Sequence, residues 1–316
     1  MQAEQPRYSI VVPIHDEAEL LPELYERLRA VLDGLDGPWE LILVDDGSTD
    51  GSYALMVELH RRDPRVRVLR FSRNFGHQLA LTAGLDRARG EAVLTMDGDL
   101  QHPPEAIPEF VARWREGHDV VYGVIAERAG QNWFKRQTAA IFYRTLKRMT
   151  ETEVPASAGD FRLVDRGALE AFKALRESNR YVRGMFSWIG YRQTAVRFAS
   201  VPRPAGRSKY TPRRMLKLAT DAIVGFSTLP LRLALNLGFA VSLLSIVLGL
   251  SAIGTKITGG FAVPGWTSIM VLVGLVGGIQ LIVIGVIGEY IGRIYDEVKQ
   301  RPLYLVSAAH GFEDEE

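Results

Sequence analysis

Two aspartates one residue apart, Asp97 and Asp99, are the residues whose types and spacing most directly indicate chemistry in this chain. They follow the apolar stretch 92–96, which has the composition of a buried strand, and Gln101 comes two residues later. Oxygen ligands at the end of a strand can hold a small, hard cation, and such a cation can bind a diphosphate. Solvated turns also contain this pattern by chance, so the rest of the sequence must decide.

Two more polar clusters follow predicted strands. One is the run of His15, Asp16 and Glu17 after the apolar residues 8–14, and the other is residues 45–48, Asp-Asp-Gly-Ser. In a parallel sheet, ligands bind at the carboxyl ends of the strands, where all three clusters should meet. Asp and Ser at such positions are also ordinary helix caps, but three clusters at one edge favour a binding site.

Strand and helix signals alternate along the first part of the chain. Apolar, β-branched runs predict strands at residues 8–14, 40–44, 66–71, 92–96 and 119–122. Helical patterns lie between them, at residues 20–32, 52–62, 76–88 and 104–116. This alternation predicts an α/β fold with a doubly wound parallel sheet. Neither G-x-G-x-x-G nor a P-loop motif is present, so neither a nicotinamide cofactor nor a P-loop triphosphate is indicated.

Composition narrows the class of protein. The 316 residues carry a net charge of +1 and include no cysteine. A chain without cysteine has no disulfide framework and no thiolate metal site, which fits a cytoplasmic catalytic part. Residues 1–7 are polar and lack the apolar core of a secretory signal. The length suggests two structural units, or one domain with an appendage.

Two long uncharged segments lie near the C-terminus. Residues 233–255 would span about 34 Å as a helix, enough to cross the hydrocarbon core of a membrane. A second uncharged run covers 257–288, and its Gly- and Pro-rich part, 258–265, reads as a turn. We therefore expect a transmembrane hairpin with its second helix at 266–288. Two buried helices of a soluble core are the alternative, although such helices rarely run this long without charge.

Basic residues flank this hairpin on both sides, whereas Lys256 is the one basic residue between the two spans. By the positive-inside rule, both ends face the cytoplasm. We expect a multi-pass protein of the cytoplasmic (inner) membrane. Its expected parts are a cytoplasmic catalytic domain at 1–200, a basic juxtamembrane segment at 201–232, two transmembrane helices at 233–290 and a cytoplasmic C-terminal tail at 291–316.

Two basic segments without acidic residues lie at 128–149 and 203–217. In the first, arginines and lysines alternate with aromatic and aliphatic residues, which is typical of a helix in the headgroup region of a membrane. Nucleic-acid binding is the competing interpretation. The neighbouring membrane spans favour lipid headgroups, so we expect membrane lipids and no nucleic acid as partners.

Several motifs occur in an order that resembles glycosyltransferase family 2. They are Val-Val-Pro at 11–13, Asp-Asp-Gly-Ser at 45–48, Ser-Arg-Asn-Phe-Gly-His at 72–77, Ala-Gly-Leu at 83–85, DGDLQHPPE at 97–105, Asp-Phe-Arg at 160–162 and Gly-Arg-Ser-Lys-Tyr at 206–210. Within this family the chain resembles the polyprenyl-phosphate glycosyltransferases, which include bactoprenol glucosyltransferases and dolichol-phosphate mannose synthases. The resemblance implies a GT-A (Rossmann-like) fold. It also implies inverting transfer of a sugar from a nucleotide diphosphate to a polyprenyl phosphate, with Mg²⁺ or Mn²⁺ as cofactor.

The resemblance also implies roles for individual residues. Asp45 and the turn from Pro13 to Glu17 would contact the nucleoside, and Asp97 would lie beside the ribose and diphosphate. Asp99 and Gln101 would be the metal ligands. The other substrate-binding candidates are basic or adjacent residues that would meet the phosphates: Arg128, Lys135, Arg136, Arg207, Ser208 and Lys209. The chain departs from the family at His15-Asp16, where an aromatic residue and Asn are usual, and at Ile125, where Arg is frequent.

Asp160, Asp99 and Arg162 are the candidate catalytic residues. Asp160 matches the position usually proposed as the base. A phosphate monoester has a second pKa near 6, so the acceptor is largely ionised and needs little proton abstraction. We expect Asp160 to orient the acceptor or nearby arginines as much as it accepts a proton. The alternative is a purely structural pairing with Arg162 in the same segment.

The sugar and the base of the donor are not written in any motif. The bactoprenol branch favours UDP-glucose and undecaprenyl phosphate, while GDP-mannose, UDP-N-acetylglucosamine and a UDP-aminosugar stay open. A processive polysaccharide synthase normally carries Q-x-x-R-W, which is absent, and needs more helices. A non-catalytic membrane scaffold is the rival from another class. Glycine pairs at 274 and 278 and at 288 and 292 would let helices approach closely, so we expect a homo-oligomer.

Overall fold

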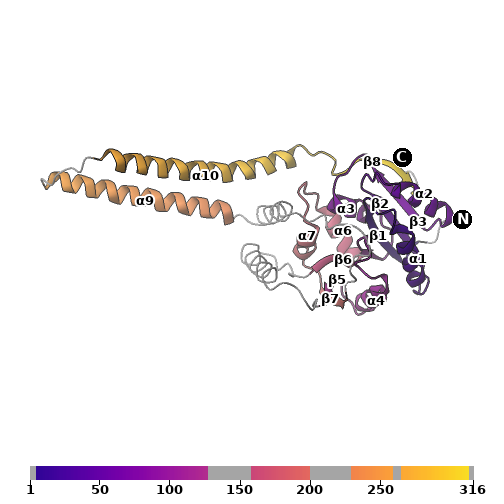
Figure 1. The fold of residues 1–316 in the computed structure, drawn as a ribbon. Helices are drawn as coiled ribbons and strands as arrows, with labels where there is room; N and C mark the ends of the chain where they lie inside the picture. The colour runs from indigo at the N-terminus through magenta and orange to yellow at the C-terminus, as the bar shows by residue number, and fades with distance from the viewer. Residues whose placement is uncertain (1–4, 127–157, 200–228, 259–264, 313–316) are drawn as a thin grey trace. The chain divides into compact units, whose positions relative to one another are not determined.

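The computed structural model describes residues 5–126, 158–199, 229–258 and 265–312 (Figure 1). The chain divides into two compact units, and each is described by itself. The first contains the N-terminal part of the chain together with residues 302–316, and the second contains residues 218–301.

The first unit is built on one eight-stranded sheet in the order β7-β5-β6-β4-β1-β2-β3-β8. The strands are β1 (Tyr8–Ile14), β2 (Trp39–Asp45), β3 (Val66–Phe71), β4 (Ala92–Thr95), β5 (Val120–Ile125), β6 (Ala158–Asp165), β7 (Gln193–Phe198) and β8 (Val306–His310). The central strands β4, β1, β2 and β3 are parallel, as predicted. All residues of β1 and β2 are buried, which explains their continuous apolar sequences.

The sheet is mixed, which corrects the expectation of a doubly wound parallel sheet, while the predicted α/β class is confirmed. Strand β6 runs antiparallel to both of its neighbours, β4 and β5, and β8 runs antiparallel to β3. Mixed sheets with antiparallel strands are common among α/β folds. Neither β6 nor β8 was among the strands predicted from the sequence, which explains why these antiparallel pairings were not expected.

Helices lie between the strands. They are α1 (Leu21–Leu32), α2 (Ser52–Arg62), α3 (His77–Arg87), the 3₁₀ helix η1 (Pro104–Ala106), α4 (Ile107–Arg115), α6 (Arg166–Ala174) and α7 (Val182–Trp188). Helix α1 buries Leu21, Leu24 and Leu28, which lie on one face at helical spacing. Helix α3 packs tightly on β1, since a Cβ atom on Gly84 would lie 2.2 Å from Cγ1 of Val11.

Strand β8 completes one edge of the sheet after the two long helices of the chain. Its pairing with β3 places His310 opposite Val68 and Ala308 opposite Arg70. Just before the strand, the ring of Tyr304 stacks on Phe71 at a centroid distance of 5.2 Å. This strand lies within residues 291–316, which were expected to form a C-terminal tail and not a strand.

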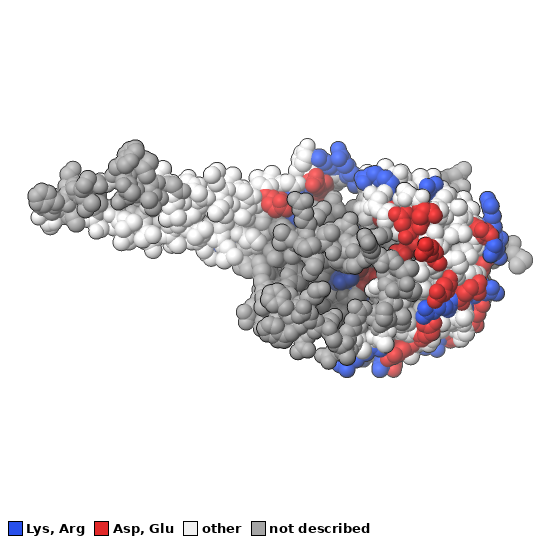
Figure 2. All heavy atoms as spheres, viewed as in Figure 1, with Lys and Arg blue, Asp and Glu red and all other residues white. Residues whose placement is uncertain are grey.

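The second unit contains α9 (Leu229–Ile257) and α10 (Trp266–Val298), which contact each other. Both are long and apolar enough to cross a membrane, over Pro230–Ser251 and Leu275–Val298. Figure 2 shows that most of the described surface of these helices carries no Lys, Arg, Asp or Glu. The two predicted helices are therefore present. Helix α10 continues past the expected end at 288, through the ion pair of Glu289 with Arg293.

Candidate active site

The loops that follow β1, β2 and β3 are joined by hydrogen bonds at the carboxyl edge of the sheet. The Thr49 amide donates to Asp16 Oδ1 at 2.7 Å, and the Asp16 amide donates to Ser48 Oγ at 3.1 Å. The Asp46 carboxylate accepts from the amide of Phe75 at 2.7 Å. The clusters predicted at 15–17 and 45–48 thus lie together, and the 72–77 segment joins them.

Two glycines allow close packing at this edge. Gly47 has a φ of +69°, and a Cβ there would lie 2.7 Å from the backbone nitrogen of Asn74. Gly98, between the two aspartates, lies so close to β1 that a Cβ would be 2.7 Å from Cδ1 of Ile14. Glycine in both motifs therefore has a steric role in bringing the loops together.

The predicted nucleoside residues lie in these first two loops. Asp45 is fully buried at the end of β2, and its Oδ1 accepts a hydrogen bond from the Ser48 amide at 2.9 Å. Pro13 lies in β1 beside Val44 of β2 in the parallel register. The amide of Glu17 donates to Ser52 Oγ at 3.1 Å, at the start of α2.

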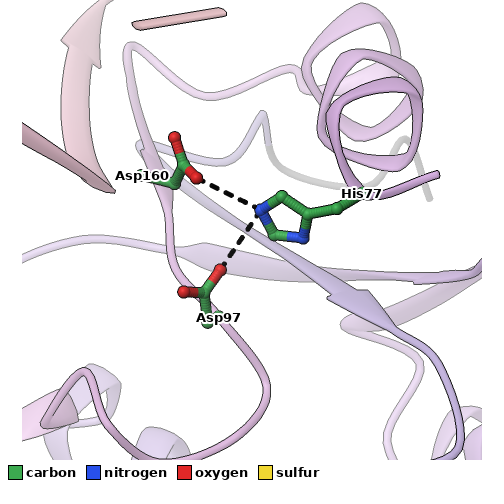
Figure 3. Close-up of side chains that lie close together, drawn as sticks. All are labelled: His77, Asp97 and Asp160. Atoms are coloured by element: carbon green, nitrogen blue, oxygen red, sulfur yellow. Dashed lines mark ion pairs between the residues drawn. The ribbon is translucent and has the colours of Figure 1, made fainter. Parts of the chain in front are cut away.

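Three side chains from separate elements converge on one point, as Figure 3 shows. His77 begins α3, Asp97 follows β4 and Asp160 lies in β6. His77 Nε2 lies 3.3 Å from Asp97 Oδ1 and 3.3 Å from Asp160 Oδ2. The arrangement brings together Asp97 and Asp160, which are 63 positions apart in the chain (160 minus 97).

Arg183 of α7 is the second cationic partner of Asp160. Its Nε and Nη2 donate to the two carboxylate oxygens, each at 2.9 Å. Burial raises the pKa of Asp160, but the charge of Arg183 and the hydrogen bond from His77 lower it well below its usual range. Asp160 is therefore an ionised carboxylate with both oxygens held by Arg183.

His77 is held between two carboxylates. The side chain of His77 is 41% exposed, and loss of hydration in the site lowers its pKa, but the hydrogen bond to Asp160 and the charges of Asp97 and Asp160 outweigh this and raise the pKa to about 9. In this arrangement the imidazole carries a proton near neutral pH and bridges the two carboxylates.

The same three residues could hold a metal ion, because their ligand atoms lie within 4.8 Å of one another. Among the described residues, Asp97 Oδ1 is buried and accepts no hydrogen bond, and its charged contact is His77 Nε2 at 3.3 Å, so a metal ion there would take the place of the His77 proton. Two features oppose a cation on the other two residues: His77 would have to lose its proton, and Arg183 already neutralises Asp160. Asp97 is thus the residue of this group that best fits a divalent cation.

The predicted ligands Asp99 and Gln101 lie in the turn after Asp97. Asp99 Oδ1 accepts a hydrogen bond from the Gln101 amide at 3.1 Å, and Leu100 between them has a φ of +60°. Both side chains are partly exposed. Among the described residues, the group of possible metal ligands is His77, Asp97 and Asp160 and does not include Asp99 or Gln101. The role of these two residues as metal ligands therefore stays a prediction.

His102 supports Asp97 from within the same turn. The amide of Asp97 donates to His102 Nδ1 at 3.0 Å, and the His102 ring stacks on Phe161 at a centroid distance of 5.0 Å. Because Phe161 is buried next to Asp160 in β6, this stacking joins the Asp97 turn to that strand.

Arg162 is buried, and its guanidinium lies over the ring of Phe186, 4.6 Å from the centroid. Burial lowers its pKa to about 10. The carboxylate of Asp160 forms its ion pairs with Arg183 and His77, so a role limited to pairing with Arg162 does not account for its position.

Sequence reasoning did not single out Arg183 or give His77 a role. His77 ends the Ser-Arg-Asn-Phe-Gly-His motif at 72–77, and this motif was the sequence feature that could have indicated a role for it. Arg183 lies in a helix without any motif. Six predicted substrate-binding residues lie outside the described residues: Arg128, Lys135, Arg136, Arg207, Ser208 and Lys209.

The family and the relatives that this chain matches are all described as glycosyltransferases. The family described as "Glycosyl transferase family 2" matches residues 9–172. A Bacillus subtilis (strain 168) protein named "Uncharacterized glycosyltransferase YkcC" is 46% identical over 308 residues, covering 98% of this chain and 95% of the relative. The "Bactoprenol glucosyl transferase" of Shigella phage SfII is 38% identical over 304 residues, covering 96% of this chain and 98% of the relative.

Among solved structures, a mannosyltransferase from Pyrobaculum calidifontis in complex with GDP-Man and Mn²⁺ is similar with a TM-score of 0.45 and 16% sequence identity. The similarity covers 92% of this chain and 88% of that chain. It is too distant to carry an argument about this site.

Proposed function

Since the chain belongs to glycosyltransferase family 2 and is a glycosyltransferase, we propose that it transfers one glucose from UDP-glucose to undecaprenyl phosphate at the cytoplasmic face of the membrane, with inversion at the sugar carbon. The observation that carries the proposal is the cluster of His77, Asp97, Asp160 and Arg183 at the carboxyl edge of the sheet. The name of the bactoprenol relative, which matches this chain over nearly its full length, supports glucose as the sugar and a polyprenyl acceptor.

The donor would bind across the loops that follow β1, β2 and β4. Asp45, Pro13 and Glu17 would contact the nucleoside, and Asp97 would lie beside the ribose and diphosphate. Displacement of the nucleoside diphosphate builds negative charge on the leaving oxygens. A divalent cation held by Asp97, Asp99 and Gln101 would supply the opposite charge there.

The acceptor phosphate would approach Asp160 and Arg183. An ionised phosphate monoester attacks the sugar carbon directly, so little proton abstraction is required. The low pKa of Asp160 makes this carboxylate a weak base, which supports an orienting role. In this proposal Asp160 fixes Arg183 and His77, and Arg183 with Arg162 places positive charge beside the incoming phosphate.

The membrane part of the proposal rests on α9 and α10. The exposed apolar side chains of α9 include Leu235 and Phe239, each 73% exposed, as expected for surfaces that face lipid. A lipid acceptor requires an enzyme at the membrane surface. The basic segments at 128–149 and 203–217 would meet the headgroups and the acceptor phosphate.

The test is a donor screen with purified full-length protein. Undecaprenyl phosphate and Mg²⁺ or Mn²⁺ are combined in turn with UDP-glucose, UDP-N-acetylglucosamine and GDP-mannose, and nucleotide release is measured with and without lipid. We expect release of UDP from UDP-glucose that requires both lipid and metal. Lipid-dependent release from another donor would contradict the proposed sugar, and no lipid-dependent release from any donor would contradict the proposed acceptor.

A further inference from the structure

The C-terminal strand β8 is joined to Asp45 by a chain of side-chain contacts. His310 Nε2 lies 2.9 Å from the hydroxyl oxygen of Tyr53 in α2. The Tyr53 ring packs against the guanidinium of Arg70, with Cζ 4.2 Å from the ring centroid. Arg70 Nε in turn lies 3.3 Å from Asp45 Oδ2. Residues from β8, α2, β3 and β2 thus form one continuous set of contacts.

Asp45 depends on Arg70 for its second carboxylate oxygen. Oδ1 accepts the Ser48 amide, whereas Oδ2 is buried and accepts no hydrogen bond from any described residue. The ion pair with Arg70 is the charged contact that the structure gives to this oxygen. A buried carboxylate oxygen without a charged or hydrogen-bonded partner is strongly disfavoured, so the position of Arg70 sets the orientation of the Asp45 carboxylate.

Arg70 needs support of its own. Its side chain is 39% exposed, and a long, partly exposed arginine has several accessible rotamers. The Tyr53 ring restricts these rotamers by a cation–π contact, and His310 fixes the Tyr53 hydroxyl. Strand β8 also holds the backbone, because Ala308 pairs with Arg70 and Ser307 Oγ donates to the Arg70 carbonyl oxygen at 3.2 Å.

We infer that β8 is a positioning element of the donor site, and that His310, Tyr53 and Arg70 are positioning residues for the nucleoside of the donor. They act through Asp45 and need not touch the substrate. The inference rests on the proposed function, in which Asp45 contacts the nucleoside. It assigns a role in donor binding to residues that follow the long apolar helices in the chain.

The alternative is that β8 only covers the open edge of β3. A covering strand would contribute to stability, but the loss of one hydroxyl from Tyr53 would then leave donor affinity unchanged. The KM for the donor therefore distinguishes a positioning role from a covering role, whereas the melting temperature does not.

The variants Tyr53→Phe and His310→Ala in the full-length protein separate these roles. Tyr53→Phe keeps the ring beside Arg70 and removes the bond to His310. Each variant should raise the KM for UDP-glucose about fivefold, which corresponds to the free energy of one ordinary hydrogen bond. The double variant should show the same fivefold increase, because the same contact is lost in each single variant and in the double variant. The kcat and the KM for undecaprenyl phosphate should not change.

Two controls complete the set. His310→Gln places an amide near the position of Nε2 and should behave like the wild type. Leu305→Ala removes a side chain that is 55% exposed in the same segment, while its backbone carbonyl still accepts from the Ser72 amide. This variant should leave the KM for UDP-glucose unchanged.

Three results would overturn the positioning role. They are an unchanged KM for UDP-glucose in both single variants, additive increases of this KM in the double variant, or an equal increase of this KM in Leu305→Ala. The Kd of UDP, measured by calorimetry on the same proteins, tests the role without turnover and should rise in parallel. A wild-type protein that binds UDP but does not transfer glucose would contradict the proposed function alone, whereas an active wild type with unaffected variants would contradict the inference alone.

Discussion

Arg183 holds Asp160 through two parallel hydrogen bonds of 2.9 Å, one to each carboxylate oxygen. The carboxylate is buried, and His77, the first residue of α3, also contacts it. This geometry gives the Asp160 carboxylate a fixed orientation and a pKa well below its usual range. In the proposed function, this carboxylate orients Arg183 and His77 beside the acceptor phosphate and need not act as a base.

The first prediction concerns this pair. Arg183→Ala leaves the Asp160 carboxylate buried without its bidentate partner, so we expect loss of transfer activity and a fall of about 3 kcal/mol in the free energy of unfolding. Chemical denaturation and the transfer assay measure the two effects. The double variant Asp160→Asn with Arg183→Gln should regain most of the stability but none of the activity. Wild-type transfer by Arg183→Ala would contradict the assignment.

The second prediction concerns the proposed metal ligands. Asp99→Asn removes an anionic ligand and should abolish most transfer at saturating UDP-glucose while the protein stays folded. Glu105→Gln is the matched control, since Glu105 lies in the same motif but pairs with Arg27 at the surface. The assay is run over a range of Mg²⁺ and Mn²⁺ concentrations. Near wild-type turnover in Asp99→Asn would show that Asp99 is not a required ligand.

The third prediction concerns Gly47. Gly47→Ala and Gly51→Ala both place alanine at a positive φ, which costs about 1 kcal/mol. A Cβ on Gly47 would also collide with the backbone of Arg73 and Asn74, whereas a Cβ on Gly51 would meet no atom of the described residues within 4 Å. Thermal unfolding should therefore show a larger loss of stability for Gly47→Ala. Equal losses would mean that the loops after β2 and β3 separate easily.

The fourth prediction concerns topology. The chain has no cysteine, so a single cysteine introduced at Thr258 or Ser307 is the one thiol available for labelling. With both ends of the hairpin in the cytoplasm, a membrane-impermeant reagent should label the Thr258 variant in intact cells and the Ser307 variant after lysis alone. The reverse pattern would place the catalytic sheet away from the cytoplasmic pool of nucleotide sugars.

The parts of the site that local sequence encodes could be predicted. The loops carrying Asp45 and Asp97 follow apolar strands directly, so their place at the carboxyl edge follows from parallel pairing. The apolar helices could be predicted from composition, because a long uncharged run has few other stable environments.

The remaining features depend on contacts between distant segments. Arg183 meets Asp160 because α7 packs near β6, and no local pattern encodes that contact. His310 meets Tyr53 through an edge strand that begins after the long helices. Strand β6 was not among the predicted strands, and its antiparallel pairing with β4 and β5 also joins segments that lie far apart in the chain.

The most direct test of the central claim is identification of the lipid product. Full-length protein is incubated with UDP-glucose, undecaprenyl phosphate and Mn²⁺, and the extracted lipid is analysed by mass spectrometry and NMR spectroscopy. The account predicts one hexose per lipid, joined through a phosphodiester with the β configuration that inversion of the α-linked donor requires. A lipid carrying several hexoses, an α-linked product, or release of UDP without any glycosylated lipid would contradict it.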